Sequence, residues 1–179
     1  MSVTQKRTIT LSIYRASIPV FLRGLDVLSV LLDRAAAHAK AHSFDVGVLL
    51  AARLAPDMLP FTRQIQRASD TAKFAAARLT DLPSPSFADT EVTLDELRRR
   101  IDATADYLKT FQPEQFDDDN DERKISYNAG GAPRQSSAQD YLLNFALPNF
   151  FFHVATAHDI LRHNGLAIGK REYLGYGRE

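Results

Sequence analysis

The residues best suited to chemistry in this chain are Asn149 and His153, four positions apart in an otherwise apolar segment rich in phenylalanine. Residues at positions i and i+4 lie one above the other on a helix, so both side chains should point the same way, into the protein. A buried imidazole or amide needs a partner, which can be another side chain, water, a metal or a ligand. The pair therefore predicts a polar contact inside the core, a small-molecule pocket or part of a metal site.

The segment that carries this pair runs from Asp140 to Gly165 and reads as one helix with a proline in its middle. Pro148 has no backbone N–H, so the carbonyl of Asn144 loses its usual helical donor and the helix can kink just before the pair. A kinked helix with inward polar groups favours a pocket between helices. Ser137 begins a pattern that resembles a capping box, and Gly165 is a C-terminal stop signal.

A third polar residue, Gln64, lies beside the apolar stripe of the segment expected to form the second long helix. It is either an edge residue hydrogen-bonded to a neighbour in its own helix or a substrate-binding residue of the same site. If the chain is an enzyme, His153 would be the general acid or base, because imidazole titrates near neutrality. Asn149 and Gln64 would then orient or polarise a carbonyl, and Tyr14 or Tyr141 would lend a hydroxyl.

Other patterns that resemble known sites are weaker. His38 and His42 also have i, i+4 spacing, but they lie near a helix C-terminus, where exposed histidines are favoured. The acidic tract Asp117–Glu122 lacks the glycine and glutamate that an EF-hand requires at its sixth and twelfth positions. The sequence has no cysteine, which excludes disulfides and thiolate sites. No Ser-His-Asp arrangement, phosphate loop or dinucleotide fingerprint can be assembled.

Four long amphipathic patterns predict the helices that must position these residues. They cover about residues 13–42, 57–79, 93–112 and 137–165, and a short turn or helix is expected at 46–52. Pro19 should open or kink the first helix, Pro56 should lie at the start of the second, and Thr93 begins a capping box. Alternation between residues 123 and 136, around Gly130-Gly131, predicts a short β-hairpin. The predicted fold class is all-α, a four-helix bundle with a hairpin before the last helix.

Composition indicates one globular domain: the chain has 179 residues, of which 45% are apolar and 25% charged. We expect an N-terminal extension at residues 1–9, the domain at 10–175 and a tail at 176–179. The net charge is zero and the basic residues are scattered singly, which argues against nucleic-acid binding. Polar residues and a proline make residues 141–157 a poor membrane span, and no secretory signal is evident, so a cytoplasmic location is expected.

Three segments resemble an uncharacterised family within the DinB/YfiT-like superfamily of metalloenzymes. They are Leu11–Leu25, Ala52–Pro60 and Asp140–Gly165, the last with the sequence Leu-Pro-Asn-Phe-Phe-Phe-His. The resemblance covers roughly residues 10–175. It implies an up-down-down-up four-helix bundle that is often a homodimer.

The same resemblance implies a divalent metal site, built from one histidine on the second helix and a His-x-x-x-His pair on the fourth. In this chain the pair falls on Asn149 and His153, and the second-helix position falls near Gln64. One histidine with two amides would bind zinc or nickel poorly, so no metal ligand and no cofactor are assigned. Asp57 or Asp70 could complete a site only by facing inward.

Three functions remain open. The leading hypothesis is a DinB-like protein with a degenerate metal site and a pocket for an unknown small molecule around Asn149 and His153. The alternatives are a metal-dependent transferase or hydrolase of the DinB type, and a non-enzymatic dimeric binding or scaffold protein. Neither a nucleic acid nor a membrane is expected as a partner, and the sequence leaves open whether the protein is an enzyme.

Overall fold

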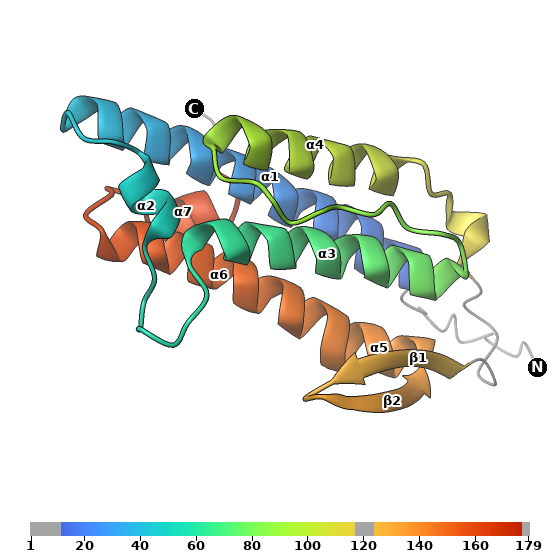
Figure 1. Cartoon of the computed structure of the whole chain (residues 1–179). Helices are drawn as coiled ribbons and strands as arrows, with labels where there is room; N and C mark the ends of the chain where they lie inside the picture. Colours follow the sequence, from blue (N-terminus) through green and yellow to red (C-terminus); the bar gives the residue numbers. More distant parts are fainter. Residues whose placement is uncertain (1–11, 117–123, 177–179) are drawn as a thin grey trace, which may run out of the picture.

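The computed structural model describes residues 12–116 and 124–176, and four long helices lie side by side within them (Figure 1). The helices are α1 (Ile13–Ala41), α3 (Phe61–Thr80), α4 (Leu94–Lys109) and α6 (Leu147–His163). The predicted short helix is α2 (Gly47–Ala51), and a 3-10 turn, η1 (Pro113–Gln115), follows α4. The predicted N-terminal extension and the acidic tract Asp117–Glu122 lie outside the described residues.

The first long helix begins where expected, and the second begins later than expected. The first, α1, begins at Ile13, and Pro19 lies inside it. The second long helix, α3, begins at Phe61 rather than near residue 57, with Pro60 in extended conformation as its N-cap. A residue that precedes proline avoids helical dihedrals, which explains why Leu59 remains outside the helix. Pro60, and not Pro56, therefore marks the start of the helix.

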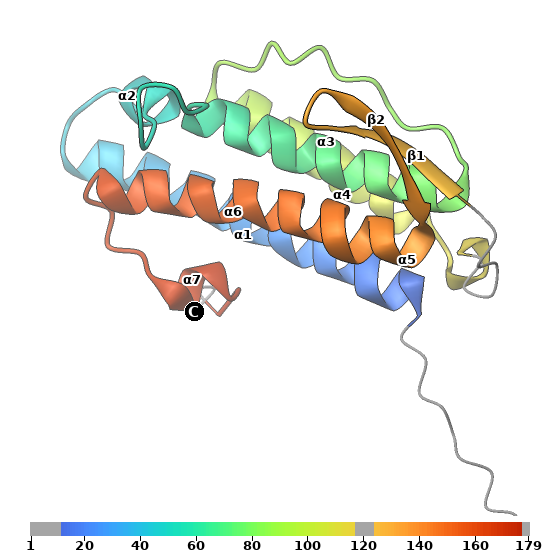
Figure 2. The ribbon, with the colours of Figure 1, turned by 90° about the horizontal axis from the view of Figure 1, so that it is seen from below.

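The segment 81–93 connects the C-terminal end of α3 to the N-terminal end of α4 by running back along the outside of the bundle (Figures 1 and 2). Asp81 leaves α3 in the left-handed conformation, with φ of 59°. The expected capping box then starts α4: the Thr93 side chain accepts from the Glu96 N–H, and the Glu96 carboxylate accepts from the Thr93 N–H. These caps satisfy backbone donors that have no partner within the first turn of a helix.

The predicted hairpin is present as the antiparallel strands β1 (Lys124–Ala129) and β2 (Ala132–Ser137). Its two-residue turn is formed by Gly130 and Gly131, with φ of 60° and 78°. Positive φ at both central residues suits the twist of a tight hairpin, and glycine adopts it without a steric cost.

The last long helical segment contains α5 (Ala138–Tyr141), a π-helical turn η2 (Leu142–Ala146) and then α6. The N–H of Leu147 donates to the carbonyl of Leu142, five residues back, immediately before Pro148. Pro148 has no N–H to donate to the carbonyl four residues before it, and the wider turn adapts the helix to this missing hydrogen bond. The expected irregularity therefore takes the form of a π-helical turn. The segment ends as predicted near Gly165, which has φ of 91° and precedes the short α7 (Lys170–Tyr173).

The hydrophobic core lies between the four long helices, and α3 has its most extensive contacts with α6. Leucine, isoleucine, phenylalanine and alanine side chains from every long helix meet there. Among the described residues, no helix combines the length and the apolar character that crossing a membrane requires. The interface of α3 with α6 holds three of the candidate residues, Gln64, Asn149 and His153.

Candidate functional site

His153 on α6 is bonded to Gln64 in the first turns of α3, with 2.7 Å between Nδ1 and Oε1. Gln64 is almost fully buried, with 1% of its surface exposed, and its Nε2 donates to the carbonyl of Leu59 at 2.9 Å. A backbone carbonyl can only accept, so the amide nitrogen of Gln64 must face Leu59 and its oxygen must face the imidazole. His153 therefore carries its proton on Nδ1.

This arrangement leaves the other ring nitrogen, Nε2 of His153, as a hydrogen-bond acceptor. No described residue bonds to it, and no fully buried polar side-chain atom of the described residues lacks a partner. Nε2 consequently reaches the protein surface. The fixed tautomer presents a lone pair outward, which suits a ligand that carries an O–H or N–H donor.

The surroundings of His153 favour the neutral imidazole. Burial and, to a smaller extent, the positive charge of Arg67 on α3 together lower the pKa of His153 from 6.5 to about 4. Both causes act against the imidazolium, because low polarity penalises any charge and a nearby cation repels a second one. At neutral pH the side chain is uncharged, and its Nε2 can accept a proton. Its single N–H, on Nδ1, is already engaged in the hydrogen bond to Gln64.

Asn149 is bonded to a different residue of α3. Its Nδ2 donates to the hydroxyl of Thr71 at 2.7 Å, and that hydroxyl donates to the carbonyl of Arg67 at 2.7 Å. Oδ1 of Asn149 has no hydrogen-bond partner among the described residues. As the spacing predicted, Asn149 and His153 both face α3, and each offers one acceptor atom that the protein does not use.

The two candidate tyrosines lie elsewhere. Tyr14 packs edge-on against Phe116, with 5.4 Å between ring centroids. The hydroxyl of Tyr141 accepts from Nη1 of Arg78 at 3.1 Å, and burial raises the pKa of the Tyr141 phenol while Arg78 opposes the rise. No hydrogen bond or ring contact in the described part of the chain joins either tyrosine to His153. The expected supply of a hydroxyl to this site has no geometric support.

No contact joins the acids that could have completed a metal site to His153 among the described residues. Asp57 is exposed, and Asp70 forms ion pairs with Lys73 at 3.0 Å and with Arg100 at 2.7 Å. Within the described ranges, no three histidine, aspartate or glutamate side chains are grouped so that they could hold a metal ion. A single histidine with two amides does not fit the donor preference of zinc or nickel.

Sequence reasoning missed several residues that surround the site. Arg67 and Thr71 lie three and seven positions after Gln64 on α3, a spacing that places them on the same helical face, so this signal was available. Two surface cavities of about 460 Å³ were not foreseen either. One lies beside the hairpin and the other between α1 and α4, and neither is lined by Asn149 or His153.

Comparisons with known proteins support the family resemblance seen in the sequence. A family model described as "Domain of unknown function (DUF1993)" matches residues 13–174. Among solved structures, the chain is similar to a DinB family member protein from Shewanella denitrificans, with 36% identity, a TM-score of 0.82 and 93% of each chain covered. No curated protein matches the sequence. The predicted kinship with an uncharacterised, DinB-like family is confirmed.

Proposed function

This chain belongs to the DUF1993 family of domains of unknown function, and we propose that it binds a small molecule through neutral His153 at a degenerate DinB-type site. One observation carries the proposal: the 2.7 Å bond from Nδ1 of His153 to Oε1 of Gln64. This bond commits the Nδ1 proton to the protein and leaves Nε2 to accept. Oδ1 of Asn149, one helical turn away, is a second acceptor, so the ligand should present two donors at a similar spacing.

Any chemistry at this site would use His153 as a proton acceptor. A general base works best when its pKa is near the working pH, and a pKa of about 4 makes His153 a weak base at neutrality. Because its pKa is so low, His153 is almost never protonated at neutral pH and cannot act as a general acid. Binding through a hydrogen bond to Nε2 is therefore the role that the geometry supports best.

The residues present do not fit a catalytic metal, so we assign no step to one. Nδ1 of His153 and Oε1 of Gln64 are engaged with each other, and Nδ2 of Asn149 is engaged with Thr71. The carboxylate of α3, Asp70, pairs with Lys73 of the same helix and with Arg100 of α4. Without carboxylates or further imidazoles, a zinc or nickel ion would lack strong donors.

Two features of the whole chain are proposed on the family likeness. The first is an up-down-down-up connectivity, supported by the segment 81–93, which returns along the bundle before α4 begins (Figure 1).

The second is a homodimer, for which Phe152 supplies exposed apolar surface next to His153, with 56% of the residue accessible. Light scattering coupled to size-exclusion chromatography tests the dimer, and a molecular mass near 20.0 kDa would contradict it.

A second candidate function is a non-enzymatic scaffold in which these polar residues fix the register of α3 against α6. The observation that favours it is the satisfaction of every fully buried polar side-chain atom among the described residues. Buried polar contacts can select one helix register. In that case, substitution of His153 would reduce stability or dimerisation without any effect on ligand binding.

A ligand screen with matched histidine variants separates the two functions. Small metabolites that carry hydroxyl or amine donors are tested by thermal shift against the wild type, His153→Gln and His163→Gln. His163 is exposed at the end of the same helix, so its substitution controls for the loss of a histidine. We expect compounds that stabilise the wild type and His163→Gln but not His153→Gln. Equal responses of all three proteins would contradict the binding role.

A further inference from the structure

Outside the His153 site, two imidazole rings lie against each other at the C-terminal end of α1. His38 and His42 are one helical turn apart, and their ring centroids are separated by 4.2 Å, with 35° between the ring planes. Residues four positions apart share a helical face, but that spacing alone does not bring two rings into contact. The structure therefore adds to the sequence pattern a direct contact between two side chains that can bind a metal.

The ring of His42 is held by the backbone of its own helix. Its Nδ1 lies 2.9 Å from the carbonyl oxygen of His38. A carbonyl can only accept, so Nδ1 carries the proton and Nε2 keeps its lone pair. No described residue bonds to Nε2, and the side chain is exposed. Histidine ligands of metals are oriented in this way, with one ring nitrogen donating to a carbonyl or carboxylate and the other bound to the ion.

His38 supplies the second ring. Its ring nitrogens have no hydrogen-bond partner among the described residues, and Phe44 packs edge-on against it, with 5.8 Å between ring centroids. Two nitrogens that each lie about 2.0–2.1 Å from one metal ion are about 3 Å apart. Rings with centroids 4.2 Å apart reach this separation by a small rotation of the His38 side chain.

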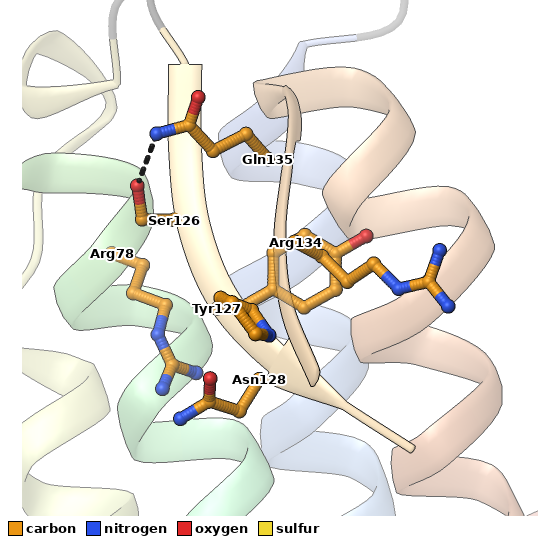
Figure 3. A pocket seen from close by; sticks show the side chains of 7 residues that line it. Arg78, Ser126, Tyr127, Asn128, Arg134 and Gln135 are labelled. Atoms are coloured by element: carbon orange, nitrogen blue, oxygen red, sulfur yellow. Dashed lines mark hydrogen bonds between the residues drawn. The ribbon is translucent and has the colours of Figure 1, made fainter. Parts of the chain in front are cut away.

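The place of the pair in the fold favours a bound cation. The C-terminal end of a helix carries partial negative charge from its carbonyl groups. Lys40 also lies in the last turn of α1, but it is about 200° around the helix from each histidine, so its charge is directed elsewhere. The pair is at the opposite end of the bundle from the β-hairpin (Figures 1 and 2). The cavity beside the hairpin, in contrast, has no histidine, aspartate or glutamate in its described lining (Figure 3).

We propose that His38 and His42 together bind one late first-row divalent metal ion, such as nickel or zinc, with Nε2 of His42 as one ligand. Imidazole nitrogens suit these ions, and two histidines in i, i+4 positions on a helix can bind the same ion. No third histidine, aspartate or glutamate of the described residues joins the pair, so water would complete the coordination. With two protein ligands the site should be weak and should fill only when metal is supplied. It is separate from the degenerate site at His153.

Isothermal titration calorimetry of the untagged full chain, freed of metal with EDTA, tests the site with nickel chloride and with zinc chloride at pH 7.5. The wild type should bind one ion per chain with a saturable isotherm. His38→Gln and His42→Gln should each weaken the affinity at least about tenfold, because the second nitrogen no longer binds within the same molecule. His42→Gln alters an exposed residue and keeps the test valid if His38→Gln disturbs the contact with Phe44.

Two histidines of α6 provide the controls. His153→Gln removes the histidine of the degenerate site, and His163→Gln removes an exposed histidine at the end of α6; both should leave the affinity unchanged. NMR of the imidazole nitrogens gives a second readout with zinc, which is diamagnetic. Zinc should shift the Nε2 resonance of His42 while the proton stays on Nδ1.

Three results would overturn the proposal. Loss of affinity in His153→Gln but not in His42→Gln would place the metal at the degenerate site. Binding that persists in the double variant His38→Gln/His42→Gln would show only adventitious association of the ion with the protein surface. A zinc-induced shift at Nδ1 of His42, with the proton on Nε2, would contradict the assigned geometry.

Discussion

His153 lies half-buried between α3 and α6, where both burial and the charge of Arg67 disfavour its protonated form. Gln64 selects which neutral tautomer is present, because its amide oxygen accepts the proton on Nδ1. The unfolded chain has neither influence, so its histidine titrates near 6.5. Folding therefore excludes a proton that the unfolded chain binds between about pH 4 and pH 6.5.

We predict that the stability of the protein declines as the pH falls from 6.5 towards 4. The folded pKa of His153 lies below the unfolded one, so the unfolded state binds more protons in this window and gains free energy. Allowing for solvent screening, the loss should be roughly 1–2 kcal/mol. Urea unfolding at pH 7, 6 and 5 measures it.

The control for this prediction is His153→Gln, which removes the titrating group and keeps a hydrogen-bonding side chain. Its free energy of unfolding should vary less between pH 7 and pH 5 than that of the wild type. Burial raises the pKa of Glu91, but its hydrogen bonds and the charge of Arg100 outweigh burial and hold that pKa below 4.5. Loss of its contribution therefore begins at lower pH and does not obscure the comparison. Identical pH profiles of the two proteins would contradict the assignment.

At the scale of the elements, α1 and α6 approach each other closely at Gly24. A Cβ at this position would overlap the ring of Phe150, which is fully buried and packed edge-on against Phe21, with 5.0 Å between ring centroids. Protein interiors are too dense for such a ring to move freely. Glycine is therefore required here by the packing of two helices and not by its backbone angles.

Gly24→Ala should destabilise the protein by about 1–2 kcal/mol. Overpacking costs about 1–3 kcal/mol, and the higher helix propensity of alanine offsets up to about 1 kcal/mol of this. Chemical denaturation measures the change. The double variant Gly24→Ala/Phe150→Leu should show a smaller combined loss than the sum of the single variants, and strict additivity would mean that the two residues do not clash.

A buried ionic network fastens the segment 81–93 to α3 and α4. Arg100 of α4 has 3% of its surface exposed and binds three carboxylates: Asp70 of α3 at 2.7 Å, Asp89 at 2.6 Å and Glu91 at 3.0 Å. One guanidinium has enough donors for all three because its five N–H groups point in different directions. The contacts explain how a long connection without helix or strand keeps a defined path.

We expect Arg100→Met to destabilise the protein by about 3–5 kcal/mol, because it leaves partly buried carboxylates without their cation. The exposed neighbour Arg99 provides the matched control, and Arg99→Met should change stability by less than about 0.5 kcal/mol. Limited proteolysis is a second measurement: the Arg100 variant should be cut faster within residues 82–92. Equal stability and equal cleavage of both variants would show that the network does not hold the segment.

For the whole molecule, the donor set predicts that stability does not depend on a divalent metal. A ligand that binds the folded state raises the melting temperature, and its removal lowers it. Prolonged treatment with EDTA should therefore change the melting temperature by less than about 1 °C. Circular dichroism measures the transition, and elemental analysis of the same sample gives the metal content. A fall of several degrees that added zinc or nickel reverses would show a metal site that the His153 region does not reveal.

The sequence by itself determined the features that depend on neighbours along the chain. The helical periods, the capping box at Thr93, the turn at Gly130-Gly131 and the stop at Gly165 all involve residues within a few positions of one another. Their propensities predicted the elements and, with the family resemblance, the kinship to DinB-like proteins. The i, i+4 spacing also predicted that Asn149 and His153 share a face.

Only the tertiary structure decided which groups meet across that face and what they do to each other. Gln64 and His153 are 89 positions apart, and Asn149 and Thr71 are 78 apart, so no local pattern specifies these pairs. The low pKa of His153 likewise depends on packing, because burial and the field of Arg67 exist only when α3 and α6 are in contact. Charges and hydrogen bonds act over a few ångströms in space whatever their separation in sequence, and the fold alone sets those distances.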